Sequence, residues 1–174
     1  MATHTSITPF SANEASCVSP SARQFAIVLA ALQKSIRHER RLENLEGLSP
    51  NEMHYWMLEA DQALDRLTDA LLDMHLIVVC PAVDRPLHRM AVLLDETLNR
   101  PSPKRSDALA YQLRYAFERD FQITEDTPYA SHNAHLLRRA RELILSMMGF
   151  NFSDRVAAMA VEPRLDAFRL FAPA

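Results

Sequence analysis

The segment MHYWMLEADQALDRLTDALLDMHLIV, residues 53–78, decides the fold of this chain. Its apolar residues recur in steps of four and three, which is the period of one face of an α-helix. The repeat is carried by Met53, Met57, Ala60, Leu64, Leu67, Leu71, Met74 and Val78. A seam of this kind packs along a partner helix. We therefore predict one long helix whose central leucines, Leu64, Leu67 and Leu71, lie in the core.

Helical spacing continues on both sides of this segment. The predicted helices run from Ser19-Pro20 to about Glu46, from Ser49-Pro50 to Cys80, from a cap at Asp84 to Asn99, from the turn at 100–103 to Phe121, and from Thr127-Pro128 to Gly149. A short helix at 153–161 and an apolar segment at 165–171 follow. No segment demands a strand, so the fold class is all-α, a helical bundle of about five main helices plus a short C-terminal helix.

The predicted domain organisation is simple. Residues 1–19 are rich in Ser, Thr and Ala and show no periodicity, so they form a flexible N-terminal arm. Residues 20–174 form a single all-α domain. Within it, only residues 47–49 separate the first two helices, which predicts an antiparallel hairpin.

The two glycines, Gly47 and Gly149, each follow a predicted helix, where the left-handed C′ position favours glycine. None is left for a phosphate-cradling loop or a nucleophile elbow. No serine or cysteine can be paired with a base as a nucleophile either, and Cys80 sits in an apolar run. The sequence therefore leaves enzymatic activity uncertain and favours a non-enzyme without a cofactor.

Composition narrows the expected partners and location. The net charge of −3 over 174 residues argues against nucleic-acid binding by bulk electrostatics. Two cysteines make neither a disulfide framework nor a zinc site, so we expect a reducing cytoplasm. No apolar run approaches the length of a membrane span, and no membrane partner is expected. Lys34 and Lys104 are the only lysines, an arginine bias typical of GC-rich, bacterial-like coding.

Four aspartates stand four residues apart on the long helix: Asp61, Asp65, Asp69 and Asp73. Each step of four turns the face by about 40°, so they form a slowly turning ladder of like charges. A basic partner surface would explain the clustering, but a solvated helix face is the more ordinary explanation, because charge runs on amphipathic helices usually face water. The cations that could neutralise the ladder internally are Arg37, Arg40 and Arg41.

The segment at residues 35–42, SIRHERRL, carries a sharper hypothesis. His38 lies about 200° from the apolar stripe of its helix, which predicts an imidazole facing solvent. An exposed histidine followed by Glu39 and by Arg41 resembles the phosphoacceptor helix of histidine kinases and phosphotransfer proteins. The resemblance implies that the acid polarises the imidazole and the base steadies the phosphoryl group. The family's Thr-Pro is replaced here by Leu42-Glu43, and no ATP-binding domain follows.

Metal ligation is the third hypothesis. Asp84 with His88, and His132 with His135, have helical ligand spacing. The Glu-x-x-His pattern of di-iron bundles is missing from the chain, so we assign no metal ligand.

The preferred function is therefore a non-catalytic helical interaction, adaptor or structural-assembly protein that binds an unidentified protein partner. The alternatives are a histidine phosphotransfer protein using His38 and a metal-binding helical-bundle enzyme. Apolar runs near both ends of the domain also predict self-association as a homodimer. The expected interface residues are Ile77, Val79, Phe168 and Phe171.

Overall fold

A computed structural model describes residues 18–43, 49–78, 82–99, 101–124 and 128–149. Every regular element in these ranges is helical, which confirms the all-α class. The elements are α1 (Pro20–Glu43), α2 (Pro50–Leu76), a 3-10 turn (Ala82–Asp84), α3 (Arg85–Leu98), α4 (Pro103–Tyr111), a π-helical turn (Gln112–Ala116), α5 (Phe117–Asp120) and α6 (Pro128–Met148). The predicted arm up to residue 17 and both predicted C-terminal segments lie outside the described residues.

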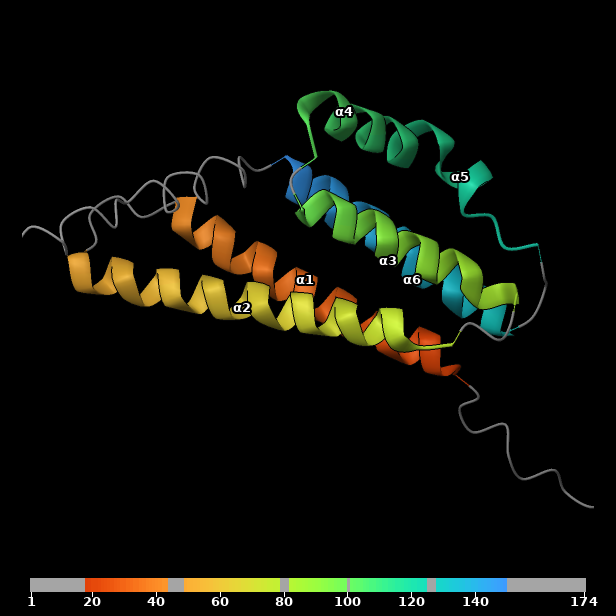
Figure 1. Cartoon of the computed structure of the whole chain (residues 1–174), viewed down its shortest axis with the longest axis horizontal. Helices are drawn as coiled ribbons and strands as arrows, with labels where there is room; N and C mark the ends of the chain where they lie inside the picture. The colour runs from red at the N-terminus through yellow and green to blue at the C-terminus, as the bar shows by residue number, and fades with distance from the viewer. Residues whose placement is uncertain (1–17, 44–48, 79–81, 100, 125–127, 150–174) are drawn as a thin grey trace, which may run out of the picture.

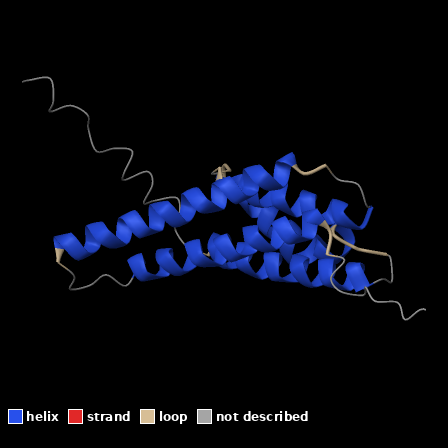
Figure 2. Ribbon diagram, turned by 90° about the horizontal axis from the view of Figure 1, so that it is seen from below, coloured by secondary structure: helices blue, strands red, loops and turns tan. Residues whose placement is uncertain are grey.

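The helices form two groups around one core. α1 and α2 lie side by side and run in opposite directions, while α3 and α6 pack beside α1, and α4 with α5 lies over α3 (Figure 1). Seen from below, the first turns of α2 project past the other helices (Figure 2). α1 therefore has neighbours on two sides, and one strip of its surface stays open.

Leucine, phenylalanine and methionine side chains fill the core between the helices. The largest fully buried ones are Phe25, Leu29, Leu32, Leu67, Leu71, Met74, Leu87, Met90, Leu94, Leu109, Leu113 and Leu137. They come from α1, α2, α3, α4, the π-helical turn and α6, so one continuous core joins the two groups of helices.

The predicted seam of α2 is confirmed in its centre and wrong at its ends. Leu67 and Leu71 are buried, and Leu64 is half-buried against the core. Met53 and Val78 are exposed. Met53 lies in the turns that project past the bundle, and Val78 follows the helix, which ends at Leu76 rather than at residue 80.

The helix ends confirm one expected cap and correct two others. Ser49 and Glu52 form a full capping box at the start of α2. Asp84 makes no capping hydrogen bond to α3, because its carboxylate is bound by side chains from elsewhere in the fold. Gly149 follows α6 as expected, but its φ lies outside the left-handed region.

The predicted fourth helix is present as α4 and α5 joined by the π-helical turn, with no break in the chain. The apolar spacing of this segment gave no sign of the π-helical turn. Among the described helices, none is both long enough and apolar enough to cross a bilayer.

Candidate functional site

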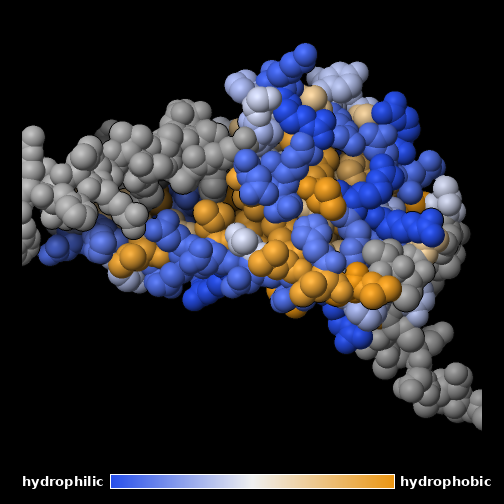
Figure 3. Space-filling model, viewed as in Figure 1, coloured by the Kyte–Doolittle hydropathy of each residue, from blue (hydrophilic) through white to orange (hydrophobic). Residues whose placement is uncertain are grey.

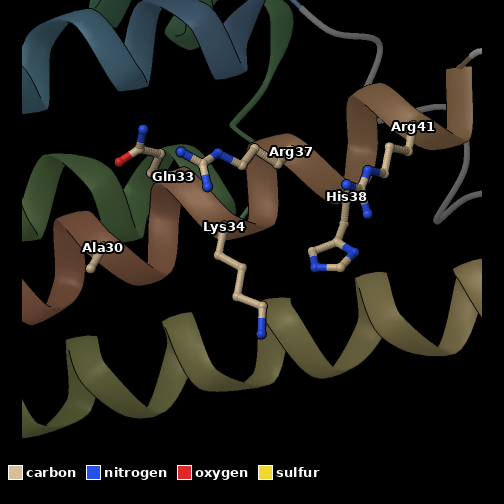
Figure 4. A pocket seen from close by; sticks show the side chains of 6 residues that line it. All are labelled: Ala30, Gln33, Lys34, Arg37, His38 and Arg41. Atoms are coloured by element: carbon tan, nitrogen blue, oxygen red, sulfur yellow. The ribbon is translucent and has the colours of Figure 1, made fainter.

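The open strip of α1 forms a shallow groove, which we call the α1 groove. Its volume is about 440 Å³, and it is lined by Ala30, Gln33, Lys34, Arg37, His38 and Arg41. Three of these residues, Lys34, Arg37 and Arg41, are cations, and their spacing of three and four places them on successive turns of one helix face. Lys34 and His38 project toward α2, whereas Arg37 lies toward Gln33 (Figure 4).

Side chains in and beside the α1 groove contact both neighbouring helices. On the α6 side, Arg139 donates a 2.5 Å hydrogen bond to the Gln33 side-chain oxygen, and Arg40 donates one of 2.8 Å to Ser146. On the α2 side, the Arg41 guanidinium stacks over the Trp56 ring, 5.0 Å from its centroid. These contacts hold Gln33, Arg40 and Arg41 against the helices on either side of the groove.

The cations of the groove have no acidic counterpart. Within the described ranges, Lys34 and Arg37 make no ion pair or hydrogen bond, and Arg41 makes only the contact with Trp56. All three side chains are exposed. Because no ion pair neutralises these three side chains in the described chain, the groove is a surface of positive charge on a chain whose net charge is −3.

His38 corrects the expectation of an exposed imidazole. The residue is only 8% exposed, and its Nδ1 atom is buried without a hydrogen-bond partner. Burial lowers the pKa of His38 below its ordinary value of 6.5. The nearby cations Lys34, Arg41 and Arg66 lower this pKa further, while Glu59 of α2 raises it.

The expectation failed because α1 has two contact faces. The apolar stripe that includes Phe25 and Leu32 predicts one buried face, but α2 covers a second one. Ser35 and Leu42 are buried there together with His38. The stripe stands out in the sequence because its residues are apolar. The second face includes polar residues such as Ser35 and His38, so the hydrophobic pattern of the sequence does not predict its burial.

The phosphoacceptor arrangement expects an imidazole that stands out into solvent, and His38 instead lies largely buried at the edge of the groove. The carboxylate that favours protonated His38 is Glu59, from another helix, and not the sequence neighbour Glu39 that the resemblance assigned to that role. Arg41 does lie beside His38 in the groove. What the groove offers chemically is a set of donors and positive charges, which suits the binding of an anion.

The aspartate ladder occupies the outward face of α2. All four of its residues, Asp61, Asp65, Asp69 and Asp73, are exposed. Within the part of the chain that the structure describes, none of them forms an ion pair. The internal neutralisation considered for the ladder, by Arg37, Arg40 and Arg41, is therefore not found there.

Exposed leucines are interleaved with the ladder. Leu58, Leu72 and Leu76 are 47%, 57% and 80% exposed. At 100° per residue they fall on the same side of α2 as Asp65 and Asp69. Figure 3 shows hydrophobic residues gathered over the C-terminal half of α2, beside hydrophilic ones. We call this mixed surface the α2 ridge.

Of the four residues predicted to form the oligomer interface, the structure describes only one. Ile77 ends α2 in extended backbone and is half-buried. Val79, Phe168 and Phe171 lie outside the described residues.

The two residue pairs considered as metal ligands, Asp84 with His88 and His132 with His135, lie in different surroundings. Asp84 accepts hydrogen bonds from Ser19 at 3.0 Å and from Asn133 at 2.9 Å, and the His88 Nε2 atom lies 3.0 Å from the Ser21 hydroxyl. His132 and His135 are exposed on α6. In the ranges described, no three His, Cys, Asp or Glu residues come together in a way that could hold a metal ion.

Comparison with known proteins adds no family to this picture. No protein-family model matches the chain, and no curated protein and no solved structure resembles it significantly.

Proposed function

We propose that this chain is a non-catalytic helical interaction protein and that the α2 ridge is its partner-binding surface. The observation that carries the proposal is the set of four exposed carboxylates that have no ion pair in the described chain. Like charges four residues apart cost a helix a few tenths of a kcal/mol per pair. A basic partner surface would offset that cost on binding.

The exposed leucines narrow the chemistry of the partner. Leu72 and Leu76 are large apolar side chains on a face that otherwise carries charge. A partner that covers them must offer apolar side chains next to its cations. The expected partner is therefore a protein with a basic amphipathic helix or a groove of the same composition.

The decisive test compares two charge-matched variants of the full chain. D65N/D69N removes two carboxylates from the ridge, and D107N/E118Q removes two exposed carboxylates from α4 and α5. A partner captured from native-cell extract with the wild type is measured against both. We expect D65N/D69N to slow association and reduce its salt dependence, while D107N/E118Q binds as the wild type does.

The same experiment also has a clear result if the α2 ridge binds no partner. If the ridge is only a solvated face, D65N/D69N binds with unchanged affinity at every salt concentration. Its melting temperature then rises slightly, because like-charge contacts have been relieved. That result would remove the ridge as a partner surface.

The proposed function also includes a cellular location and an oligomeric state for this chain. We infer a reducing cytoplasm, because Cys17 and Cys80 do not make a disulfide framework. We also propose that the chain forms a homodimer through apolar surface that includes Ile77. Light scattering on concentrated protein tests this, and a monomer mass at every concentration would contradict it.

A further inference from the structure

Unlike the α2 ridge, the α1 groove has the properties of a small-molecule site. It is a concave space of about 440 Å³, within the range of small-molecule pockets. Three cations border it, and the described chain offers Lys34 and Arg37 no counter-ion. A bound anion would replace repulsion among these side chains with attraction.

An independent observation at the same place also points to a ligand. His38 lines the groove, is more than nine-tenths buried, and carries a polar atom without a partner. Because a buried, unpaired N–H is rarer than an unpaired acceptor, the neutral ring is best assigned its proton on Nε2. No hydrogen bond to Nε2 is found in the described chain either, so this N–H, and not the buried Nδ1, is assigned as the donor to an occupant of the groove.

The donor set matches phosphate oxygens. Arg37 and Arg41 offer planar forks that bind phosphate in bidentate fashion, and Lys34 offers a point charge. Since Arg139 binds the Gln33 oxygen, the Gln33 amide nitrogen is left as a further donor. Among the described residues that line the groove none is a carboxylate, and the acid that acts on His38 from outside this lining is Glu59 of α2.

The spacing of the cations sets the size of the anion. Residues 34 and 41 are seven positions apart on one helix, which is a rise of roughly 10 Å. Because the three cations are spread along that length of helix, two or three linked phosphates would meet more of them than a single phosphate would. We propose that the α1 groove binds a small molecule carrying a diphosphate or triphosphate group.

Calorimetry on the full chain at low salt tests the proposal, with inorganic phosphate, pyrophosphate and tripolyphosphate as probes. We expect one site per chain and affinity that rises with the number of phosphates. A nucleoside triphosphate run beside tripolyphosphate then shows whether the groove also recognises an organic group. Absence of saturable binding by either polyphosphate would overturn the proposal.

Matched variants locate the binding. K34Q/R37Q removes two charges from the groove, and R85Q/K104Q removes two exposed charges from α3 and α4 that have no partner in the described chain. We expect K34Q/R37Q to weaken pyrophosphate binding at least tenfold and R85Q/K104Q to leave it nearly unchanged. Equal losses in both variants would mean that the anion follows net charge and would overturn the site.

The imidazole of His38 supplies a second readout that does not depend on affinity. An anion beside it favours the protonated ring, so pyrophosphate should raise the pKa of His38 in an NMR titration. The groups that already act on this ring are Lys34 and Arg41 of α1 and Glu59 and Arg66 of α2. An unchanged titration with saturating pyrophosphate would place the anion elsewhere. Binding should persist in D65N/D69N, so this proposal fails or succeeds apart from the ridge.

Discussion

The side-chain amide of Asn133 donates a hydrogen bond of 2.9 Å to Oδ1 of Asp84, and this contact joins the first half of α6 to the start of α3. The same oxygen accepts a hydrogen bond of 3.0 Å from Ser19, at the entry to α1. Asp84 and Asn133 are both almost fully buried. One carboxylate therefore ties three helices together at one end of the bundle.

Replacing Asn133 by alanine should destabilise the fold by about 1–3 kcal/mol. The substitution removes a donor from a buried carboxylate, and a buried polar group without its partner costs about that much. Urea unfolding measures the loss. His132→Ala, at the exposed neighbouring position on α6, is the matched control and should change the stability by less than about 0.5 kcal/mol. Equal effects of the two substitutions would show that the contact contributes nothing.

Leu67→Ala should cost about 2–5 kcal/mol, the range for deleting a large apolar side chain from a packed core. Leu67 is 0% exposed in the centre of α2. Leu72 lies five residues on, at 57% exposure, so Leu72→Ala removes the same atoms from the surface of the same helix. The two unfolding curves should differ by more than about 1.5 kcal/mol. Comparable losses would contradict the orientation of α2.

Ser49→Ala should destabilise the chain by about 0.5–2 kcal/mol, because it removes the side chain on which the capping box of α2 depends. Ser102 provides a control within the chain, since it precedes α4 at the equivalent position without a capping hydrogen bond. Ser102→Ala should therefore cost much less. Hydrogen exchange in the first turn of α2 should quicken in Ser49→Ala alone.

The helices themselves could be predicted because their signals are local. Apolar spacing depends on neighbours three and four residues away, and the pair Ser49 and Glu52 defines a helix start within one turn. What could not be predicted depends on distant contacts. Asp84 has the sequence position of a cap, yet it binds Ser19 and Asn133 because the fold brings them close. Neither partner stands near Asp84 in the sequence.

The candidate site likewise has one part that local sequence signals predict and one part that depends on contacts between distant helices. The exposure of Asp65 and Asp69 followed from their position opposite the apolar seam of one helix. The α1 groove did not, because it lies on the part of α1 that α2 and α6 leave open, and no pattern within α1 reports which of its sides those helices cover. His38 was singled out for its charged neighbours, but its burial was decided by α2.

Two histidines, the buried His38 and the half-buried His88, should make the stability of the chain depend on pH. Burial lowers the pKa of His38 and of His88 below the ordinary value of 6.5. Near each ring, other charged groups adjust the effect. Around His38 these are Glu59, Lys34, Arg41 and Arg66, and around His88 they are Asp84 and His75.

The sign follows from which state binds the proton first. As the pH falls below about 6.5, the imidazoles of the unfolded chain become protonated before those of His38 and His88 in the folded chain, because the folded-state pKa values are lowered. The unfolded state then binds more protons, so the free energy of unfolding should decrease from about pH 7 toward pH 5. Above about pH 7 both states are neutral at these positions, and they contribute no slope.

Urea titrations at several pH values should therefore show a flatter slope in H38Q/H88Q than in the wild type, whatever the absolute stability of the variant. The control H132Q/H135Q changes two exposed histidines of α6 and should keep the wild-type slope. Using slopes rather than absolute stabilities separates titration from the loss of packing that any core substitution brings. A wild-type slope in H38Q/H88Q would mean that these two imidazoles have the same proton affinity in the folded and unfolded chains.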